Sequence, residues 1–219
     1  GADLLFGLGG DDRLQGEAGN DRLFGQTGDD VLEGGAGRDI LNGGAGADAF
    51  LGQAGRDMAS YFGAEAGVTV ALANAALNAG EAAGDTHVGI EDLLGTAFGD
   101  DLRANNANNL VFAQAGDDTV RGLGGNDVLL GGDGDDVLFV QAGGDRLIGY
   151  HTERGPRTMA AAYYAGPLGA AFHMKFAGID HPQFYRNWYT TTENMIKRMR
   201  FAGQNLYLMG HFMYNGVLY

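Results

Sequence analysis

The stretch Gly7–Asp57 repeats every nine residues, and this period constrains the fold more than any other feature. Each unit has glycine at positions 1 and 4, aspartate at position 6 and, with one exception at Ala59, Leu or Phe at position 8. A fixed short period indicates a solenoid, in which each repeat adds one layer. The six units are GLGGDDRLQ, GEAGNDRLF, GQTGDDVLE, GGAGRDILN, GGAGADAFL and GQAGRDMAS.

The chemistry of one unit follows from its nine positions. Positions 7 to 9 predict a strand so short that only the eighth side chain points inward, and such a strand needs copies of itself alongside. Positions 1 to 6 predict a turn, where glycine accepts positive φ and lets backbone carbonyls approach one another. The aspartate brings an anionic oxygen to the same place in every repeat. Oxygen donors without thiol or imidazole suit a hard cation such as Ca²⁺.

A second block, residues 100–149, returns in a different phase. The unit ANNANNLVF lacks glycine and carries Asn109 in the sixth position, which predicts a weak or empty cation site. Ala113 and Val140 replace the first glycine of their units, so the best sites of this block are expected at Asp118, Asp127 and Asp136. Its six sixth positions are Asp100, Asn109, Asp118, Asp127, Asp136 and Asp145.

The unit resembles the G-G-x-G-x-D-x-U-x nonapeptide of the RTX (repeats-in-toxin, hemolysin-type) calcium-binding repeat family. The resemblance implies an all-β parallel β-roll or β-solenoid for residues 1–149, with alternate turns on opposite edges and several Ca²⁺ ions between neighbouring turns. It also implies a secreted, extracellular or cell-surface protein that is exported by type I secretion machinery and folds where calcium is plentiful. Asp3 and Asp57 close the first block, with a neighbouring turn on one side only. The metal ligands that the resemblance implies are Asp3, Asp12, Asp21, Asp30, Asp39, Asp48, Asp57, Asp118, Asp127, Asp136 and Asp145.

Residues 61–99 separate the first block (1–60) from the second (100–149). Val68–Ala73 and Gly84–Gly95 show strand-like alternation, so we expect irregular coils of the same solenoid. A flexible linker is the alternative, although apolar residues such as Val70, Leu72, Ile90 and Leu93 disfavour it. Three acidic side chains of this segment could hold metal, but we expect them to be solvated surface charges: Asp85, Glu91 and Asp92.

Residues 150–219 differ in composition, since they hold 14 of the 22 aromatic residues and six of the seven methionines. Leu168–Ile179 and Leu206–Met209 predict strands, and residues 182–202 between them predict an amphipathic helix. A βαβ unit needs a larger parallel sheet, so we expect a truncated α/β segment here. Residues 175–219 also show a weaker resemblance to the start of a (β/α)-barrel glycoside-hydrolase-like domain. That resemblance would place Asp180, His181 and His211 near strand ends, where capping and packing are the simpler roles.

The charge distribution narrows the choice of partners. Residues 1–149 carry 25 acidic and 7 basic side chains, a formal charge of −18, which opposes compaction until cations neutralise it and disfavours nucleic acid. There is no cysteine, so bound metal is the available substitute for disulfides. No apolar run could span a membrane, and no signal peptide is visible. The sequence opens at Gly1 inside a repeat, and we interpret it as an internal piece of a longer protein.

The sequence therefore predicts calcium binding coupled to folding. Phosphate binding is disfavoured, because the glycine-rich turns lack the Gly-Lys-Ser/Thr ending of a P-loop and the helix that follows a Rossmann loop. No catalytic constellation is recognisable, so whether the chain belongs to an enzyme stays open. The alternatives are an accessory module of an extracellular hydrolase, whose domain would begin near residue 168, and the spacer of an adhesin or surface-layer protein.

Overall fold

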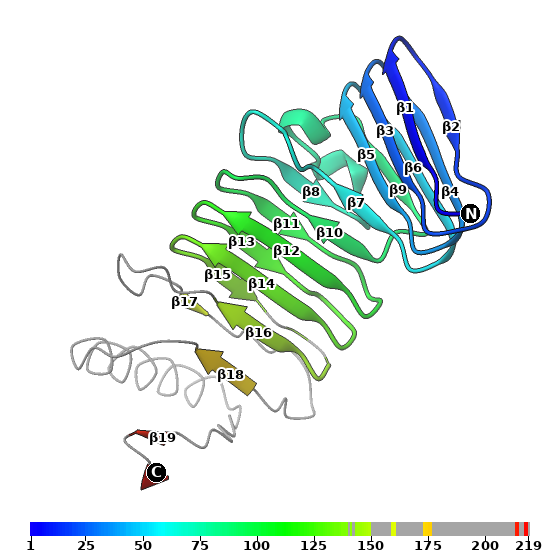
Figure 1. Cartoon of the computed structure of the whole chain (residues 1–219). Coiled ribbons are helices and arrows are strands. Elements are labelled where there is room, and N and C mark those ends of the chain that lie inside the picture. Colours follow the sequence, from blue (N-terminus) through cyan, green and yellow to red (C-terminus); the bar gives the residue numbers. More distant parts are fainter. Residues whose placement is uncertain are drawn as a thin grey trace.

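A computed structural model of the chain describes residues 1–139, 141, 143–149, 159–160, 173–176, 213–214 and 217–218. Within these residues the fold is a parallel β-solenoid without α-helices, in which the strands are stacked as successive rungs (Figure 1). The parallel β-solenoid that the resemblance implies is therefore confirmed. No helix in the described part of the chain is long and apolar enough to cross a membrane.

Three parallel sheets form the walls of the solenoid. Sheet A is one wall, with nine strands: β1 (Leu4–Gly9), β3 (Arg22–Thr27), β5 (Ile40–Ala45), β7 (Met58–Ser60), β10 (Asp92–Leu94), β12 (Leu110–Ala115), β14 (Val128–Asp133), β16 (Arg146–Gly149) and β18 (His173–Phe176). Sheet B covers the first block with β2 (Arg13–Gln15), β4 (Val31–Gly37), β6 (Ala49–Gly55) and β9 (Thr86–Val88). Sheet C covers the second block with β8 (Thr69–Ala71), β11 (Asp101–Arg103), β13 (Thr119–Arg121), β15 (Val137–Phe139) and β17 (Met159–Ala160). A separate antiparallel pair joins β19 (Met213–Tyr214) to β20 (Val217–Leu218).

One coil of the solenoid is 18 residues, or two nonapeptides, so that consecutive units face opposite walls. Leu23 pairs with Leu41 in sheet A, and Leu32 pairs with Phe50 in sheet B. Several strands are longer than the three residues predicted, because residues of the next unit continue the pairing between coils before the turn, as Gln26 and Thr27 do with Gly44 and Ala45. β3, for example, runs from Arg22 to Thr27.

The core consists of the eighth side chains, as the repeat predicts. Leu23, Leu32, Leu41 and Phe50 have no exposed surface. The column under sheet A continues through Leu93, Val111 and Leu129, all of them fully buried. Ala59 interrupts this column at the place where the opposite wall changes from sheet B to sheet C. The larger side chains of Tyr61 and Phe50 pack together there, with ring centroids 6.0 Å apart.

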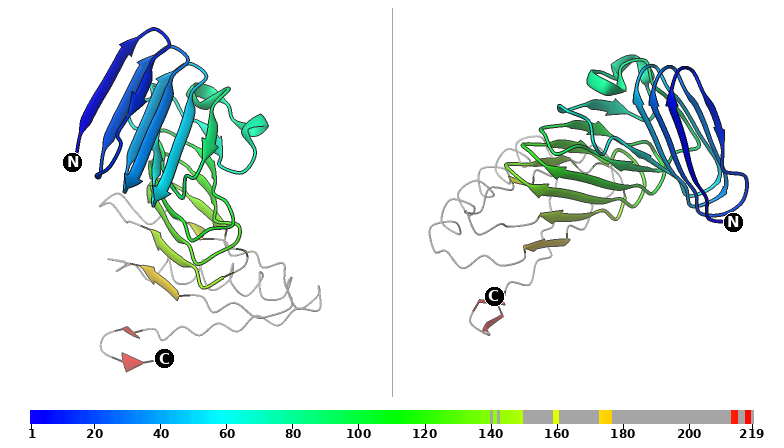
Figure 2. Two further views of the ribbon diagram at one scale, coloured as in Figure 1. Left: turned by 90° about the vertical axis from the view of Figure 1, so that its right-hand side faces the viewer. Right: turned by 45° about the horizontal axis from the view of Figure 1, so that its top comes forward.

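The regular coil lengthens between the two blocks. In the regular repeats, residues that pair between neighbouring coils are 18 positions apart. At the turn into sheet A of this coil the separation is 34, as between Asp57 and Glu91, which are hydrogen-bonded. The added residues contain β8, β9 and two 3-10 helices, η1 (Ala75–Leu77) and η2 (Gly80–Ala82), which project from the side of the solenoid (Figure 2). β9 is the last strand of sheet B, whereas β8 is the first of sheet C. The second wall is thus divided where the first is continuous.

Residues 61–99 contribute strands and core side chains to the solenoid. Val70 and Leu93 have no exposed surface, and Ile90 is 3% exposed. The expectation that Asp85 and Asp92 are solvated surface charges is wrong, since they are 0% and 2% exposed. Asp85 directly precedes β9 and Asp92 is the first residue of β10, and each accepts hydrogen bonds from a backbone amide and a side chain.

Most predictions for residues 150–219 lie outside the described residues. These are the helix at 182–202, the strand at 206–209, and the positions of Asp180, His181 and His211. The strand expected within Leu168–Ile179 is present as β18, which pairs in parallel with β16.

Candidate cation sites at the two edges

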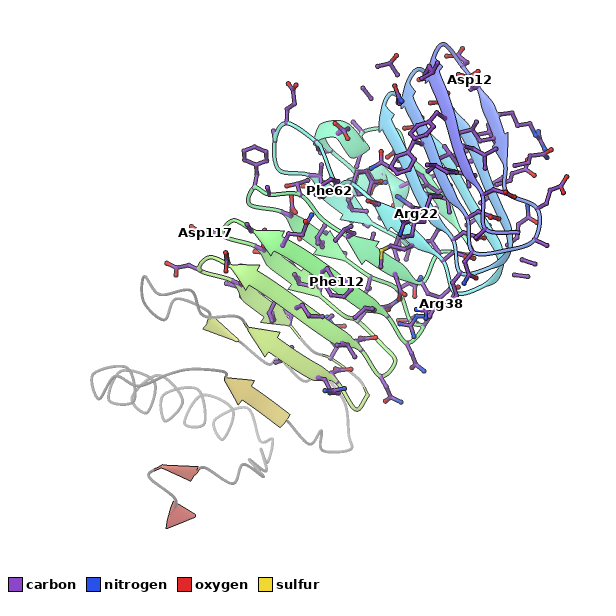
Figure 3. All side chains as sticks on the ribbon, in the orientation of Figure 1. Asp12, Arg22, Arg38, Phe62, Phe112 and Asp117 are labelled. Atoms are coloured by element: carbon purple, nitrogen blue, oxygen red, sulfur yellow. The ribbon has the colours of Figure 1, made fainter. Side chains whose placement is uncertain are left out.

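The sixth-position aspartates form two rows, one along each edge of the solenoid. The turns that lead into sheet A form the first edge, which carries Asp3, Asp21, Asp39, Asp57, Asp127 and Asp145. The turns that lead into sheets B and C form the second edge, which carries Asp12, Asp30, Asp48, Asp118 and Asp136. The two edges lie on opposite sides of sheet A, as the fifth-position residues Arg38 and Asp117 show (Figure 3). All eleven predicted ligands therefore lie in these rows.

The first carboxylate oxygen of these aspartates joins adjacent coils. The Asp21 amide donates to Asp39 Oδ1 at 2.8 Å on the first edge, and the Asp30 amide donates to Asp48 Oδ1 at 2.9 Å on the second. The same bond recurs in the second block, where the Asp118 amide donates to Asp136 Oδ1. Each aspartate thus supplies an amide to the next coil and an acceptor to the preceding one. We call this series the amide–carboxylate ladder.

The second carboxylate oxygen has a different environment. Nine Oδ2 atoms are buried without a hydrogen-bond partner in the part of the chain that the structure describes, although buried polar groups are usually paired. The side chains are deeply enclosed, with Asp21, Asp30 and Asp39 each 1% exposed. The nine belong to Asp12, Asp21, Asp30, Asp39, Asp48, Asp57, Asp118, Asp127 and Asp136.

The first glycine of each unit lines the space beside this oxygen. A Cβ atom added to Gly16 would lie 2.6 Å from Asp21 Oδ2 and 2.6 Å from the Gly34 carbonyl oxygen of the next coil. At Gly7 the corresponding distances, to Asp12 Oδ2 and the Gly25 carbonyl, are 2.9 and 2.8 Å. Glycine is required here to keep a carboxylate and a backbone carbonyl facing the same space. At position 4 the requirement is conformational, as the φ of +128° at Gly28 shows.

Burial perturbs the protonation of these groups. Burial, together with the charge of neighbouring carboxylates, raises the pKa of Asp48, Asp118 and Asp127 from the ordinary 3.8 to about 7. Burial likewise raises the pKa of Asp57 to about 6. A buried, unpaired carboxylate is costly when ionised, and a nearby cation removes that cost.

Side chains alone do not complete a metal site. No three His, Asp or Glu side chains converge on one point among the described residues, so backbone carbonyls would have to supply the other ligands. The carbonyls beside the first glycines are suitable donors. Carboxylate and carbonyl oxygens together form a set that matches the ligand preference of Ca²⁺.

Sequence reasoning missed how the rows end between the blocks. Asp57 is not the last member of its row, because Glu91 Oε2 accepts a hydrogen bond from the Asp57 amide at 2.9 Å. On the second edge, Asp85 takes the next sixth position, since its Oδ1 accepts the Asp48 amide at 2.9 Å. The signal was present in Gly84-Asp85-Thr86-His87-Val88, which places an aspartate directly before a short alternating strand.

Asp85 is joined to two further side chains in the core. The Tyr61 hydroxyl lies 2.8 Å from Asp85 Oδ2 and 2.9 Å from His87 Nε2. His87 occupies the inward position of β9 and stacks on Phe50 with ring centroids 5.0 Å apart. The Tyr61 hydroxyl donates its proton to Asp85, so towards His87 its oxygen can only accept. The proton of the neutral His87 imidazole therefore lies on Nε2. Burial lowers the pKa of His87 to about 4, which favours this neutral form.

Fifth-position residues form a second, exposed series of hydrogen bonds. Asp11 Oδ1 accepts the Asp29 amide at 2.9 Å, and Asn108 Oδ1 accepts the Asn126 amide at 2.7 Å. This series holds the outer parts of neighbouring turns at a constant spacing. It therefore supports the sites without contributing to their buried oxygens.

Comparison with known families agrees with this geometry. The family model described as RTX calcium-binding nonapeptide repeat (4 copies) matches residues 1–32, 24–59, 94–129 and 112–147. These matches cover more than half of the 219 residues and leave out the lengthened coil. No curated protein matches the chain.

Proposed function

Because this chain belongs to the RTX calcium-binding nonapeptide repeat family, we propose that its sixth-position aspartates bind calcium and that binding drives folding of the solenoid. The observation that carries the proposal is the set of nine buried Oδ2 atoms without a partner among the described residues. The proposal includes Asp3 and Asp145 as the outer members of their row. Asp3 is 59% exposed, so we expect its contribution to be weaker.

Each part of the unit has a role in this function. The amide–carboxylate ladder fixes Oδ1 and thereby aims Oδ2 at the space beside the first glycine. The leucine columns hold adjacent coils at the spacing of hydrogen-bonded strands, about 4.8 Å. A bound calcium ion would supply the positive charge and the coordination that the buried carboxylates lack. Without neutralisation, the rows of carboxylates repel one another and oppose closure of the coils.

The donor set favours calcium over magnesium. The ligands are carboxylates and backbone carbonyls whose positions are set by the turns, which is compatible with the higher and more irregular coordination of Ca²⁺. Mg²⁺ demands near-ideal octahedral geometry and retains several waters. We therefore expect magnesium to substitute poorly.

The proposal extends to where the protein acts. Coupling between calcium and folding is useful to a chain that crosses a membrane unfolded and folds outside, where calcium is abundant. Export of this kind, through type I secretion machinery, is the expectation that the family resemblance supports.

A calcium titration tests the function. The whole chain, started in chelated buffer, should gain β signal cooperatively in far-ultraviolet circular dichroism when calcium is added, and magnesium at the same concentration should give little change. Full β signal in chelator, with no response to calcium, would show that the leucine columns alone stabilise the solenoid and would overturn the proposal.

A further inference from the structure

The lengthened coil and its neighbouring turns differ from the repeats in how their carboxylates are satisfied. We call residues 58–61 and 85–109 the junction, since the two blocks meet there. In the repeats, the sixth-position Oδ2 has no partner among the described residues. At the two sixth-position aspartates of the junction, Asp85 and Asp100, donors from the protein itself occupy the corresponding oxygens.

Asp48 and Asp85 provide a matched comparison on the second edge. Each accepts an amide of the preceding coil through Oδ1 at 2.9 Å, and they are 1% and 0% exposed. They differ at the second oxygen. Asp48 Oδ2 is buried without a partner in the described residues, whereas Asp85 Oδ2 accepts the Tyr61 hydroxyl at 2.8 Å.

Asp100, which opens the second block on the same edge, is also satisfied by the protein. Its Oδ2 accepts the Thr96 amide at 2.7 Å, and its Oδ1 accepts the Thr96 hydroxyl at 2.9 Å. Oδ1 also accepts the Val68 amide at 2.8 Å. Both ends of the interrupted row are therefore closed by hydroxyl or amide donors.

On the first edge, the junction contains Asp92, the first residue of β10, which directly follows the sixth-position Glu91. Arg56 Nε and Nη2 donate to the two oxygens of Asp92, both at 2.8 Å, so a guanidinium provides the positive charge beside this carboxylate. In the next coil, Asn109 Nδ2 donates to the Glu91 carbonyl oxygen and to Asn105 Oδ1. The amide nitrogen of Asn109 cannot serve as a ligand for a cation, and its hydrogens point at oxygens that could otherwise do so.

The junction is also well packed. Tyr61, Leu93 and Leu102 are at most 1% exposed, as is Val70 of the adjoining strand β8. Asn78 ties the inserted loop to the coil, because its side chain accepts the Ala71 amide at 2.7 Å and donates to the Asp85 carbonyl at 2.9 Å. Apolar burial and neutral or paired hydrogen bonds are sources of stability that do not depend on a metal ion.

We propose that the junction is a calcium-independent clasp that stays folded in chelator and divides calcium binding into two separate groups of sites, one in each block. The inference rests on the proposed calcium-binding function and assigns closed positions to Asp85, Asp100 and Asn109. Calcium then folds each block outward from a preformed layer, so the unfavourable first step of assembling a solenoid is already complete.

Hydrogen exchange of the whole chain in chelator and in calcium tests the clasp. In chelator, junction amides such as those of Tyr61 and Asp101 should exchange at least about tenfold more slowly than the ladder amides of Asp21 and Asp30. Calcium should then slow the ladder amides and change the junction amides little. Equal rates for junction and ladder in chelator, with both slowed by calcium, would overturn the clasp while leaving calcium-driven folding intact. Protection of both in chelator would instead count against calcium-driven folding.

A pair of variants tests the closed positions independently. Asn109→Asp restores the carboxylate and removes the blocking amide, so equilibrium dialysis should find about one more bound calcium ion per chain than in the unmodified protein. Asn108→Asp adds the same charge at the adjacent, exposed fifth position and should leave the number unchanged. An unchanged number in Asn109→Asp, or the same gain in both variants, would refute the assignment of Asn109 as a closed site.

Discussion

Replacing Leu32 by alanine should cost about 3–5 kcal/mol of the free energy of unfolding, the upper part of the usual range for this change. Leu32 has no exposed surface and lies between Leu14 and Phe50 in the column under sheet B. Removing three buried carbon atoms loses about 2.4 kcal/mol of transfer free energy at about 0.8 kcal/mol each. Strands on both sides hold the backbone in register, so the cavity cannot collapse and its cost adds to the loss.

The assay is chemical denaturation in saturating calcium, so that the sites remain filled and only the core changes. Leu4→Ala is the matched control, because Leu4 is 60% exposed on the outer face of β1 and its truncation should change the free energy by less than about 0.5 kcal/mol. A loss below about 1 kcal/mol for Leu32→Ala, or equal losses in the two variants, would show that the columns do not carry the core.

Two further predictions concern the carboxylates. Asp30→Ala should lower calcium affinity and thermal stability together, because it removes a buried Oδ2 and leaves the Asp12 amide without its acceptor, at about 1–3 kcal/mol. Asp30→Asn, which keeps Oδ1, should lose calcium affinity with a smaller loss of stability in chelator; unchanged calorimetric titrations of both variants would contradict a ligand role. The second prediction is that the calcium-free protein is more stable near pH 5 than near pH 8. Carboxyl groups whose pKa is raised from 3.8 to about 6 or 7 in the folded state hold more protons than in the unfolded state at the same pH. Their contribution to the free energy of unfolding is therefore lost as the pH rises from about 4 to about 7. His87, with its pKa lowered to about 4, acts in the opposite direction below pH 6.5 but is a single group. Thermal melts in chelator across this range measure the difference, and stability that rises with pH would refute it. The carboxyl groups with values of about 6 or 7 are Asp48, Asp57, Asp85, Asp118 and Asp127.

The regular part of the fold was readable from the sequence because each feature recurs at the same position of a short period. Leu23 and Leu41 predicted the buried columns, and Asp21 and Asp39 predicted the rows at the edges. A single leucine or aspartate at these positions would not predict a fold. Their recurrence every nine residues predicts the solenoid.

The lengthened coil was harder to predict because its residues leave the period. Asp85 follows Asp48 by 37 residues instead of the 36 of two coils, so it falls outside the phase of either block. Its partner Tyr61 is 24 residues away, and nothing in the local sequence joins the two. Asp92 was mistaken for surface charge because the guanidinium of Arg56, which covers it, lies 36 residues upstream. Burial of these carboxylates depends on contacts between distant residues, which only the fold provides.

The amide–carboxylate ladder gives the solenoid a polarity. In every such bond, an amide donates to the carboxylate one coil further along the chain, as from Asp21 to Asp39. The end of the stack towards the N-terminus therefore presents carboxylate oxygens, which water solvates readily, whereas the other end presents backbone amides that need an acceptor. Through this ladder, a folded coil offers acceptors to the coil that precedes it in sequence and donors to the coil that follows. The two ends of the stack therefore differ in chemistry, as in a filament with two unlike ends.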